Sequence, residues 1–318
     1  PSPRAPSPRA QSTPTPETFP RPSRALPPAS RPGVNTFHQE NVLGTSFRLV
    51  VVGGTEDGET YLRVALAEVA RQRKTFSRHD PESELSRINA LPWEERKRLS
   101  VSTHLARVLR WAESWHGRSG GAFAPYGGHL FRRLEQATSP DQARGTPEPR
   151  SAGFRLTKKG KRYLLDCERD GSFDLDAIAK GFIVDRALRA VTRTKPLPKG
   201  ALVDIGGDIA AWGSSDPRQA APWEVDVADP RRPAENSPPL DRLALRGMCV
   251  ASSGGYARPT VAGGRMRPHL FDPTTGLPAE GILGATVVAP DAASADALAT
   301  ILCVLAPKES LELVEATP

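Results

Sequence analysis

The chain has 318 residues, a formal net charge of +7 and only three cysteines. This length suffices for one large domain or two modest ones, and no apolar run approaches the roughly 20 residues that a membrane-spanning helix needs. The cysteines (Cys167, Cys249 and Cys303) form neither a CxxC pair nor a metal-ligand spacing, so we expect no disulfide framework and no zinc site.

The N-terminal segment differs in composition from the rest of the chain. Residues 1–33 are rich in proline, serine, alanine and arginine, and almost lack large apolar side chains. Such a segment does not bury enough surface to order itself, so we predict a disordered tether over 1–35 and one folded domain over 36–318. Five arginines and one glutamate give the segment a charge of +4 and leave the folded part near +3. With no basic helix carrying aromatics and no helix-turn-helix signal, we expect no nucleic-acid partner.

The same segment suggests where the protein works. A proline-rich leader before a folded domain is typical of an exported protein that hangs from a membrane. We therefore expect a periplasmic or cell-envelope location, with a membrane tether through this segment and a lipid anchor upstream of Pro1, rather than a cytoplasmic one. A linker after a preceding domain, or a cloning boundary, would explain the composition equally well.

In the first half of the chain, apolar periodicity predicts strands and helices from about residue 36 onward. We expect a strand at 45–52, helices at 59–76 and 105–116, a short helix capped by Ser83, a glycine-rich loop at 119–128, and short strands at 153–156 and 162–166. The polar, proline-containing stretch 137–150 indicates an excursion at the surface.

In the second half, a helix is expected to open within 174–185 and to continue to about Thr192. Further strands are predicted at 200–205, 223–227, 243–252 and 284–289, followed by a helix of small residues that contains 294–300. The mixture of strands and helices, without an internal repeat, indicates a single α+β (mixed α/β) domain.

The last helix carries Asp296 and Thr300, four residues apart and therefore on one face. A carboxylate and a hydroxyl offer two hard oxygens to a cation such as Mg²⁺, which indicates phosphate chemistry. Two local explanations compete: an Asp in the first turn of a helix favours the helix dipole, and a Thr in a helix often bonds to its own preceding turn. The pair is expected at the edge of the apolar stripe.

Four glycine-bearing loops follow or flank the predicted strands, at 119–128, 174–181, 206–208 and 252–256. A glycine-rich loop lets backbone amides approach a ligand closely, although any one such loop is usually only a turn. Together with the Asp296 helix and the turn that contains His269, they describe a site that holds a phosphorylated ligand by backbone amides and a metal.

Several of these segments resemble the ApbE family of FAD:protein FMN transferases. The matching strings are DLDAIAKGFIVD (174–185), ALVDIGGDIAAWG (201–213), SELSRINA (83–90), SGGAFAPYGG (119–128), HLFDPTTGLP (269–278) and ADALATILCVLAP (295–307). Their order and spacing match over roughly residues 40–310. The resemblance implies a single ApbE-like (T-fold-like) domain. It also implies an enzyme that binds FAD and Mg²⁺, attaches FMN through a phosphoester to a Thr or Ser hydroxyl of an acceptor flavoprotein, and releases AMP.

The resemblance also assigns roles to residues of this chain. The metal ligands would be the Ala177 carbonyl, the Asp296 carboxylate and the Thr300 hydroxyl. His269 would be the general base, a task that suits an imidazole with an ordinary pKa of about 6.5; its alternative role is to tie down the turn that follows it. FAD would be contacted by Leu43, Ala122, Phe123, Asp174, Lys180, Gly206, Gly207, Asp208 and Leu270.

Some positions depart from the family pattern. Ala124 and Tyr126 stand where the family usually has Asp and Thr, Gly255 stands where it has Asp, Leu43 stands where Met is common, and Pro259 lies within an expected strand. We therefore expect retained chemistry with altered flavin affinity or partner choice. Two rival functions use the same site: a metal-dependent FAD pyrophosphatase that yields FMN and AMP, and an FAD-binding envelope protein with weak turnover.

Overall fold

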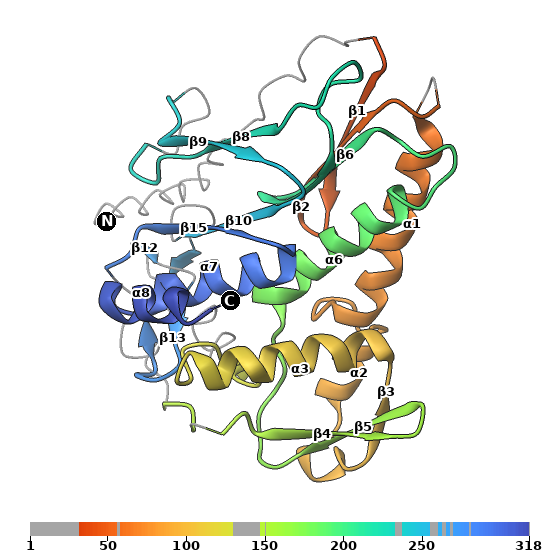
Figure 1. Cartoon of the computed structure of the whole chain (residues 1–318). Coiled ribbons are helices and arrows are strands. Elements are labelled where there is room, and N and C mark those ends of the chain that lie inside the picture. The colour runs from red at the N-terminus through yellow and green to blue at the C-terminus, as the bar shows by residue number, and fades with distance from the viewer. Residues whose placement is uncertain are drawn as a thin grey trace, which may run out of the picture.

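The computed structural model describes residues 32–55, 58–129, 147–149, 151–232, 237–254, 260–262, 265–267, 270–279 and 281–317. A large sheet with helices on one face lies at one end of the molecule, and a smaller sheet with its own helices lies at the other (Figure 1). This arrangement confirms the predicted class, a single domain of mixed strands and helices.

The large sheet has six strands, and each is antiparallel to its neighbours. In spatial order they are β1 (Val34–Val42), β2 (Thr45–Val52), β6 (Gly200–Ile205), β7 (Asp208–Gly213), β10 (Cys249–Gly254) and β15 (Gly284–Ala289). β2, β6 and β15 have the predicted bounds. β1 begins two residues before the predicted start of the domain, so Val34 and Asn35 belong to the sheet.

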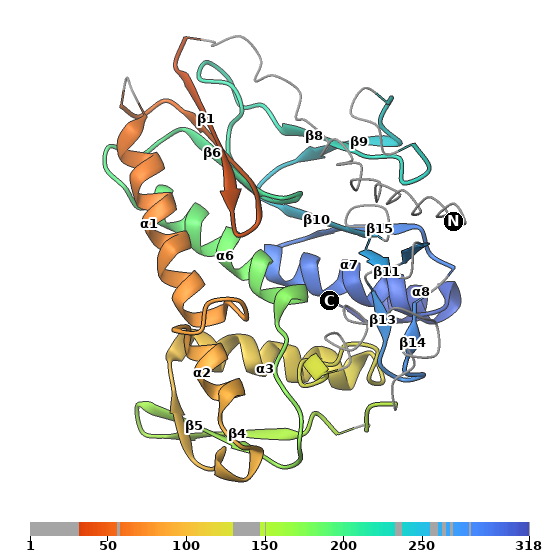
Figure 2. The ribbon, with the colours of Figure 1, turned by 180° about the vertical axis from the view of Figure 1, so that it is seen from behind.

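Helices α1 (Glu59–Phe76), α6 (Asp176–Val191) and α7 (Ala292–Val304) cover one face of this sheet (Figures 1 and 2). Side chains of a strand alternate between its two faces. On β2, Phe47, Leu49 and Val51 pack with the helices, whereas Val52 packs on the opposite face against the hairpin of β8 (Trp223–Val227) and β9 (Asp241–Leu245). β2 is therefore buried on both of its faces at this end.

The smaller end of the domain holds a three-stranded sheet and two helices. The strands lie in the order β3 (Leu99–Val101), β5 (Arg162–Cys167) and β4 (Phe154–Lys159), next to α2 (Glu84–Ala90) and α3 (Thr103–Arg118). The remaining elements are a 3₁₀ turn (Trp93–Glu95), β11 (Thr260–Ala262), β12 (Arg265–Arg267), β13 (Phe271–Asp272), β14 (Leu277–Pro278) and α8 (Pro307–Glu315). Ser83 caps α2 as predicted, since its Oγ accepts a hydrogen bond from the Ser86 amide at 3.0 Å.

Three expectations from the sequence were wrong. The strand expected at 243–252 is two strands, because a turn with Gly247 at φ 66° separates β9 from β10. Residues 252–254 of the expected loop 252–256 belong to β10, while 255 and 256 lie outside the described residues. Most of the expected loop 174–181 is helical, because α6 already begins at Asp176.

Two further expectations, about cysteines and membrane spans, can be compared with the described residues. All three cysteines are buried and free, which confirms that they form no disulfide. In the described part of the chain, no helix has both the length and the apolar character that crossing a membrane requires.

Candidate active site

The candidate site lies where α6 crosses α7, and Gly181 determines how closely these helices approach. A Cβ atom at this position would lie 2.2 Å from the carbonyl oxygen of Ala292, a distance that no side chain tolerates. Gly181 therefore serves helix packing rather than a ligand-binding loop, which corrects the expectation from sequence. The close approach brings polar groups of one helix into reach of the backbone of the other.

Asp296 of α7 reaches the backbone of α6 because the two helices lie close together. Its side chain is 3% exposed, and its Oδ2 accepts a hydrogen bond from the Gly181 amide at 3.0 Å. The residue lies within the buried face of α7, not at its edge as expected. It is also not in the first turn: Asp291 is the N-cap, with its side chain accepting a hydrogen bond from the Ser294 amide at 2.7 Å. The helix dipole therefore does not explain why Asp296 is at this position. Its contact with a second helix, α6, does.

The charges around Asp296 are not balanced. Burial raises its pKa well above the usual range, the neighbouring carboxylate of Asp208 raises it further, and Lys180 acts in the opposite direction. Lys180 Nζ lies 2.7 Å from Asp208 Oδ2, and the Asp208 side chain is only 1% exposed. Two buried carboxylates thus share one ammonium group, which favours the binding of an additional cation.

The other two predicted metal ligands lie one turn further along the same helix pair. Asp296 accepts the amide of Gly181, which in a regular helix would donate to the carbonyl of Ala177 four residues earlier. The Asp296 carboxylate and the Ala177 carbonyl thus compete for the same donor, the Gly181 amide. On α7, one turn after Asp296, Thr300 Oγ1 lies 3.2 Å from Ser253 Oγ of β10.

These groups fit a small hard cation. A carboxylate, a hydroxyl and a backbone carbonyl are oxygen ligands of the kind that Mg²⁺ prefers, and Mg²⁺ commonly completes its shell with waters and substrate phosphates. Across the described ranges, no cluster of three or more His, Cys, Asp and Glu side chains could hold a metal. A cation at this site would therefore be held by the Thr300 hydroxyl and the Ala177 carbonyl as well as by Asp296, with waters or substrate phosphates completing its shell.

Two tight turns at one end of the large sheet hold four of the residues that we assigned to FAD binding. Leu43 lies in the turn between β1 and β2 with φ 53°, an uncommon conformation for a bulky residue. Gly206 and Gly207 connect β6 to β7 with φ 61° and 96°, as a two-residue hairpin requires. The Gly206 amide donates to the Ser46 carbonyl, so the two turns lie side by side. Asp208, the first residue of β7, connects this end of the sheet to Lys180.

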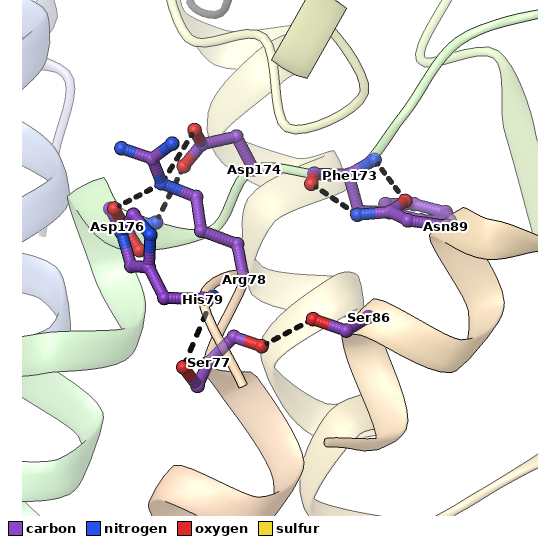
Figure 3. Close-up of polar contacts among 8 residues, drawn as sticks. All are labelled: Ser77, Arg78, His79, Ser86, Asn89, Phe173, Asp174 and Asp176. Atoms are coloured by element: carbon purple, nitrogen blue, oxygen red, sulfur yellow. Dashed lines mark hydrogen bonds and ion pairs between the residues drawn. The ribbon is translucent and has the colours of Figure 1, made fainter. Parts of the chain in front are cut away.

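Asp174 lies just before α6, where Arg78 bridges two carboxylates (Figure 3). Arg78 Nε is 3.5 Å from Asp174 Oδ2 and 2.8 Å from Asp176 Oδ2. Asn89 of α2 fixes the preceding residue, because its side chain donates to the Phe173 carbonyl and accepts from the Phe173 amide, each at 2.8 Å. The entry to α6 is thus held from two sides.

The glycine-rich loop 119–128 joins this region to the last predicted contacts. Ala122 and Phe123 are buried, and the Phe123 amide donates to Ser119 Oγ at 3.0 Å. The Asp174 amide donates to the Pro125 carbonyl, which places the loop beside the entry to α6.

The turn after Leu270 faces the same loop. A Cβ at Gly121 would lie 3.8 Å from Thr274 Cγ2. Asp272 shapes the turn, since its carboxylate accepts hydrogen bonds from the amide and hydroxyl of Thr274 at 2.8 and 2.7 Å. The Leu270 carbonyl accepts from the Ala279 amide at 3.0 Å. His269, the predicted general base, lies outside the described residues.

Sequence reasoning gave no role to Arg78, Asn89 or Ser253, although each contacts a predicted site residue or its neighbour. Asn89 lies inside a string that matched the family and Ser253 lies in the glycine-bearing stretch 252–256, and both positions were usable signals. Arg78 lies in a loop without periodicity, and its contact with Asp176 spans 98 residues of sequence. No local pattern could have identified that contact.

Comparisons with known proteins find similar sequences and similar folds. The ApbE family profile matches residues 43–318. An FAD:protein FMN transferase of Treponema pallidum is 30% identical over 303 residues, covering 88% of this chain and 81% of the relative. The ApbE protein of Thermotoga maritima superposes with a TM-score of 0.74 at 27% identity, covering 89% and 90% of the two chains. The flavinyl transferase ApbE of Pseudomonas stutzeri, in its apo form, gives 0.70 at 25% identity, covering 89% and 88%.

Proposed function

The chain belongs to the ApbE family and is a transferase, and we propose that it moves the FMN half of FAD onto a Thr or Ser hydroxyl of a partner flavoprotein in a Mg²⁺-dependent reaction. A bond forms between the acceptor oxygen and the FMN phosphorus while the pyrophosphate bond of FAD breaks. AMP leaves, and the proton of the hydroxyl passes to a base. The product is a protein-bound FMN phosphoester.

The observation that carries this proposal is the environment of Asp296. A carboxylate that is 3% exposed, close to Asp208 and served by the one cation of Lys180, is costly for a fold without a ligand. A divalent cation held by Asp296, Thr300 and the Ala177 carbonyl would offset that cost. Once bound, it would neutralise negative charge on the pyrophosphate and on the departing AMP.

The remaining residues are proposed to bind and orient the substrate. The Lys180 side chain is 21% exposed, so its ammonium group is accessible to phosphate oxygens while it stays paired with Asp208. The turns at Leu43 and Gly206, the entry to α6 at Asp174, and the loop at Ala122 and Phe123 are proposed to line the FAD site. Their hydrogen bonds to neighbouring elements support a site that is formed before the substrate arrives.

His269 is proposed to take the proton of the acceptor hydroxyl. The turn at 271–276, shaped by the hydrogen bonds of Asp272, follows this residue in sequence and lies next to the loop at Gly121. His269→Ala should slow FMN transfer by about 100-fold while FAD binding, followed by flavin fluorescence, stays unchanged. If FAD binding were lost instead, His269 would be a structural residue of the turn.

Mass spectrometry provides the direct test. The protein is incubated with FAD and Mg²⁺, with and without an acceptor domain that carries one target Thr, and with a version of that domain in which Val replaces the Thr. A gain of one FMN on the Thr domain alone, abolished by a chelator, would support the transferase. FMN and AMP formed without labelling would favour the pyrophosphatase, and unchanged bound FAD would favour a binding protein.

We also propose a cell-envelope location, on the composition of residues 1–33 alone. The acceptors would then be envelope flavoproteins. Fractionation of cells that produce the native protein would test this: recovery in the cytoplasmic fraction would contradict the location without affecting the proposed chemistry.

A further inference from the structure

Asp185, on α6, contacts the first turn of α7, and no comparison gives it a role. Its Oδ1 accepts a hydrogen bond from the Ala292 amide at 2.9 Å, and its Oδ2 accepts one from the Ala293 amide at 3.1 Å. The thiol of Cys249 approaches Oδ1 at 3.8 Å. The carboxylate thus binds two consecutive amides of a helix that lies more than 100 residues away in sequence.

Three amides at the start of α7 have side-chain partners. The first amides of a helix have no partner within the helix and need one from elsewhere. Asp185 takes those of Ala292 and Ala293, while the side chain of Asp291 takes that of Ser294. Both carboxylates also suit the positive end of the helix dipole. Of these two carboxylates, Asp185 joins α7 to another helix, whereas Asp291 is the N-cap of α7 itself.

A second carboxylate joins the same helices in the opposite direction. Asp296 of α7 accepts the Gly181 amide of α6, whereas Asp185 of α6 accepts amides of α7. The two contacts are four residues apart on each helix, and they run antiparallel: 185 pairs with 292, and 181 with 296. One further turn in the same direction leads to Ala177 and Thr300. Both views show α6 and α7 side by side along this line (Figures 1 and 2).

We propose that Asp185 is a positioning residue for the metal site: it fixes α7 against α6 so that Asp296 and Thr300 stand opposite the Ala177 carbonyl. This inference rests on the proposed function, because it concerns the same cation. Asp185 itself lies two turns from Ala177 and does not touch the metal ligands. Groups that hydrogen-bond metal ligands directly contribute about 10- to 100-fold to metal affinity, so a carboxylate that acts through the helix packing is expected at the lower end of this range.

The matched control for Asp185 is Asp291, the other carboxylate at the same helix end. Asp185→Ala and Asp291→Ala each remove the acceptor of first-turn amides, but only the first breaks the connection between α6 and α7. Asp185→Asn keeps one acceptor oxygen and serves as the second variant if the alanine variant does not fold. Mn²⁺, which shares the preference for oxygen ligands, is the probe, and its free concentration is followed by electron paramagnetic resonance.

Both Asp185 variants should raise the dissociation constant of Mn²⁺ by about 10-fold or more, and Asp291→Ala should change it by less than about 3-fold. Excess Mg²⁺ should restore most of the FMN transfer rate of the Asp185 variants, because their ligands are intact. Wild-type affinity for Mn²⁺ in the Asp185 variants would overturn the proposal. So would equal weakening by Asp291→Ala, since the effect would then belong to helix capping.

The two proposals can fail separately. A wild-type protein that does not label an acceptor, while Mn²⁺ binding follows the pattern above, would contradict the transferase function and leave the role of Asp185 supported. A wild-type protein that labels the acceptor, with Mn²⁺ binding insensitive to Asp185, would contradict the role of Asp185 alone.

Discussion

Two groups of charged side chains flank the first turns of α6, and each contains two carboxylates and one cation. The outer group consists of Arg78, Asp174 and Asp176. Arg78 contacts both carboxylates, at 3.5 and 2.8 Å, and the Asp176 side chain is 53% exposed. Each carboxylate has a direct cationic partner. Asp176 is also open to water, and Asp174, whose side chain is 10% exposed, also accepts the Asp176 amide, so this group has no need of a further cation.

The inner group has the same composition and the opposite character. It consists of Lys180, Asp208 and Asp296, of which both carboxylates are buried. Lys180 contacts Asp208 directly, and Asp296 relies on one backbone amide. The comparison teaches that the number of charges does not separate the two groups: in the outer group Arg78 contacts both carboxylates, whereas in the inner group one buried carboxylate is held by a backbone amide.

The largest effect is expected from Asp296→Asn, which removes the negative charge of the inner group. FMN transfer should fall by about a thousandfold, because the cation loses its charged ligand. Metal-free protein should not become less stable, since a buried carboxylate with a raised pKa is replaced by a neutral amide. Transfer rates and thermal unfolding with and without Mg²⁺ would check both points. An unchanged Mg²⁺-dependent rate would remove Asp296 from the metal site.

Lys180→Met would sharpen the comparison, because it leaves two buried carboxylates without their ammonium partner. We expect a loss of about 3 kcal/mol in the free energy of unfolding, together with weaker FAD binding. Urea denaturation of the metal-free protein measures the first effect. A loss below about 1 kcal/mol would show that water reaches Asp208 and that the inner group is not truly buried.

The pH dependence of the free energy of unfolding tests the burial of the Asp185 carboxylate between α6 and α7. Burial raises the pKa of Asp185 to about 6 from the ordinary 3.8, and the nearby Asp291 contributes in the same direction. The folded chain therefore holds a proton that the unfolded chain has lost between about pH 4 and pH 6. The contribution of Asp185 to stability falls as the pH rises through this window and is constant above it.

Asp185→Asn lacks this proton and serves as the reference for that measurement. Its stability relative to the wild type should rise by about 2 to 3 kcal/mol between pH 4 and pH 7.5. Urea denaturation of both proteins at several pH values gives this difference. A difference that does not change with pH would mean that Asp185 titrates like an exposed carboxylate.

The smallest effect is expected in the outer group, from Arg78→Met. The pair with the exposed Asp176 contributes little, and Asp174, whose side chain is 10% exposed, keeps a backbone hydrogen bond, so the free energy of unfolding should fall by only about 1 to 2 kcal/mol. FAD affinity should weaken by only a few-fold, because Asp174 keeps its hydrogen bond from the Asp176 amide at 3.0 Å. If Arg78→Met lost more free energy of unfolding than Lys180→Met, the comparison between the two groups would be contradicted.

The sequence was informative where a single element determined the answer. The bounds of α1, β2, β6, β8 and β15 follow from local periodicity, and all five were predicted correctly. β1 was missed because it is an edge strand whose residues His38 to Asn41 are exposed and polar, so its sequence lacks the alternation of a buried strand. β7 was not predicted, because it directly follows Gly206 and Gly207 and such a glycine pair also fits a ligand-binding loop.

The candidate site could be predicted only through the motifs. Asp296 was identified, but its burial and its contact with Gly181 depend on a helix 115 residues away. The roles of the glycines could not be predicted from the sequence either. Gly181 permits helix packing, whereas Gly206 and Gly207 form a hairpin turn. The same residue type serves two different physical needs, and only the neighbouring chain distinguishes them.

The separation of 115 residues between Gly181 and Asp296 has a consequence for biosynthesis. A ribosome adds about 5 to 20 residues per second, so α6 emerges several seconds before α7 exists. During that interval the chain holds Ala177 and Lys180 but lacks Asp296 and Thr300. An unfinished chain, or one cut before α7, would therefore have only part of the proposed metal site. Cleavage of FAD would begin only when synthesis of the domain is nearly complete.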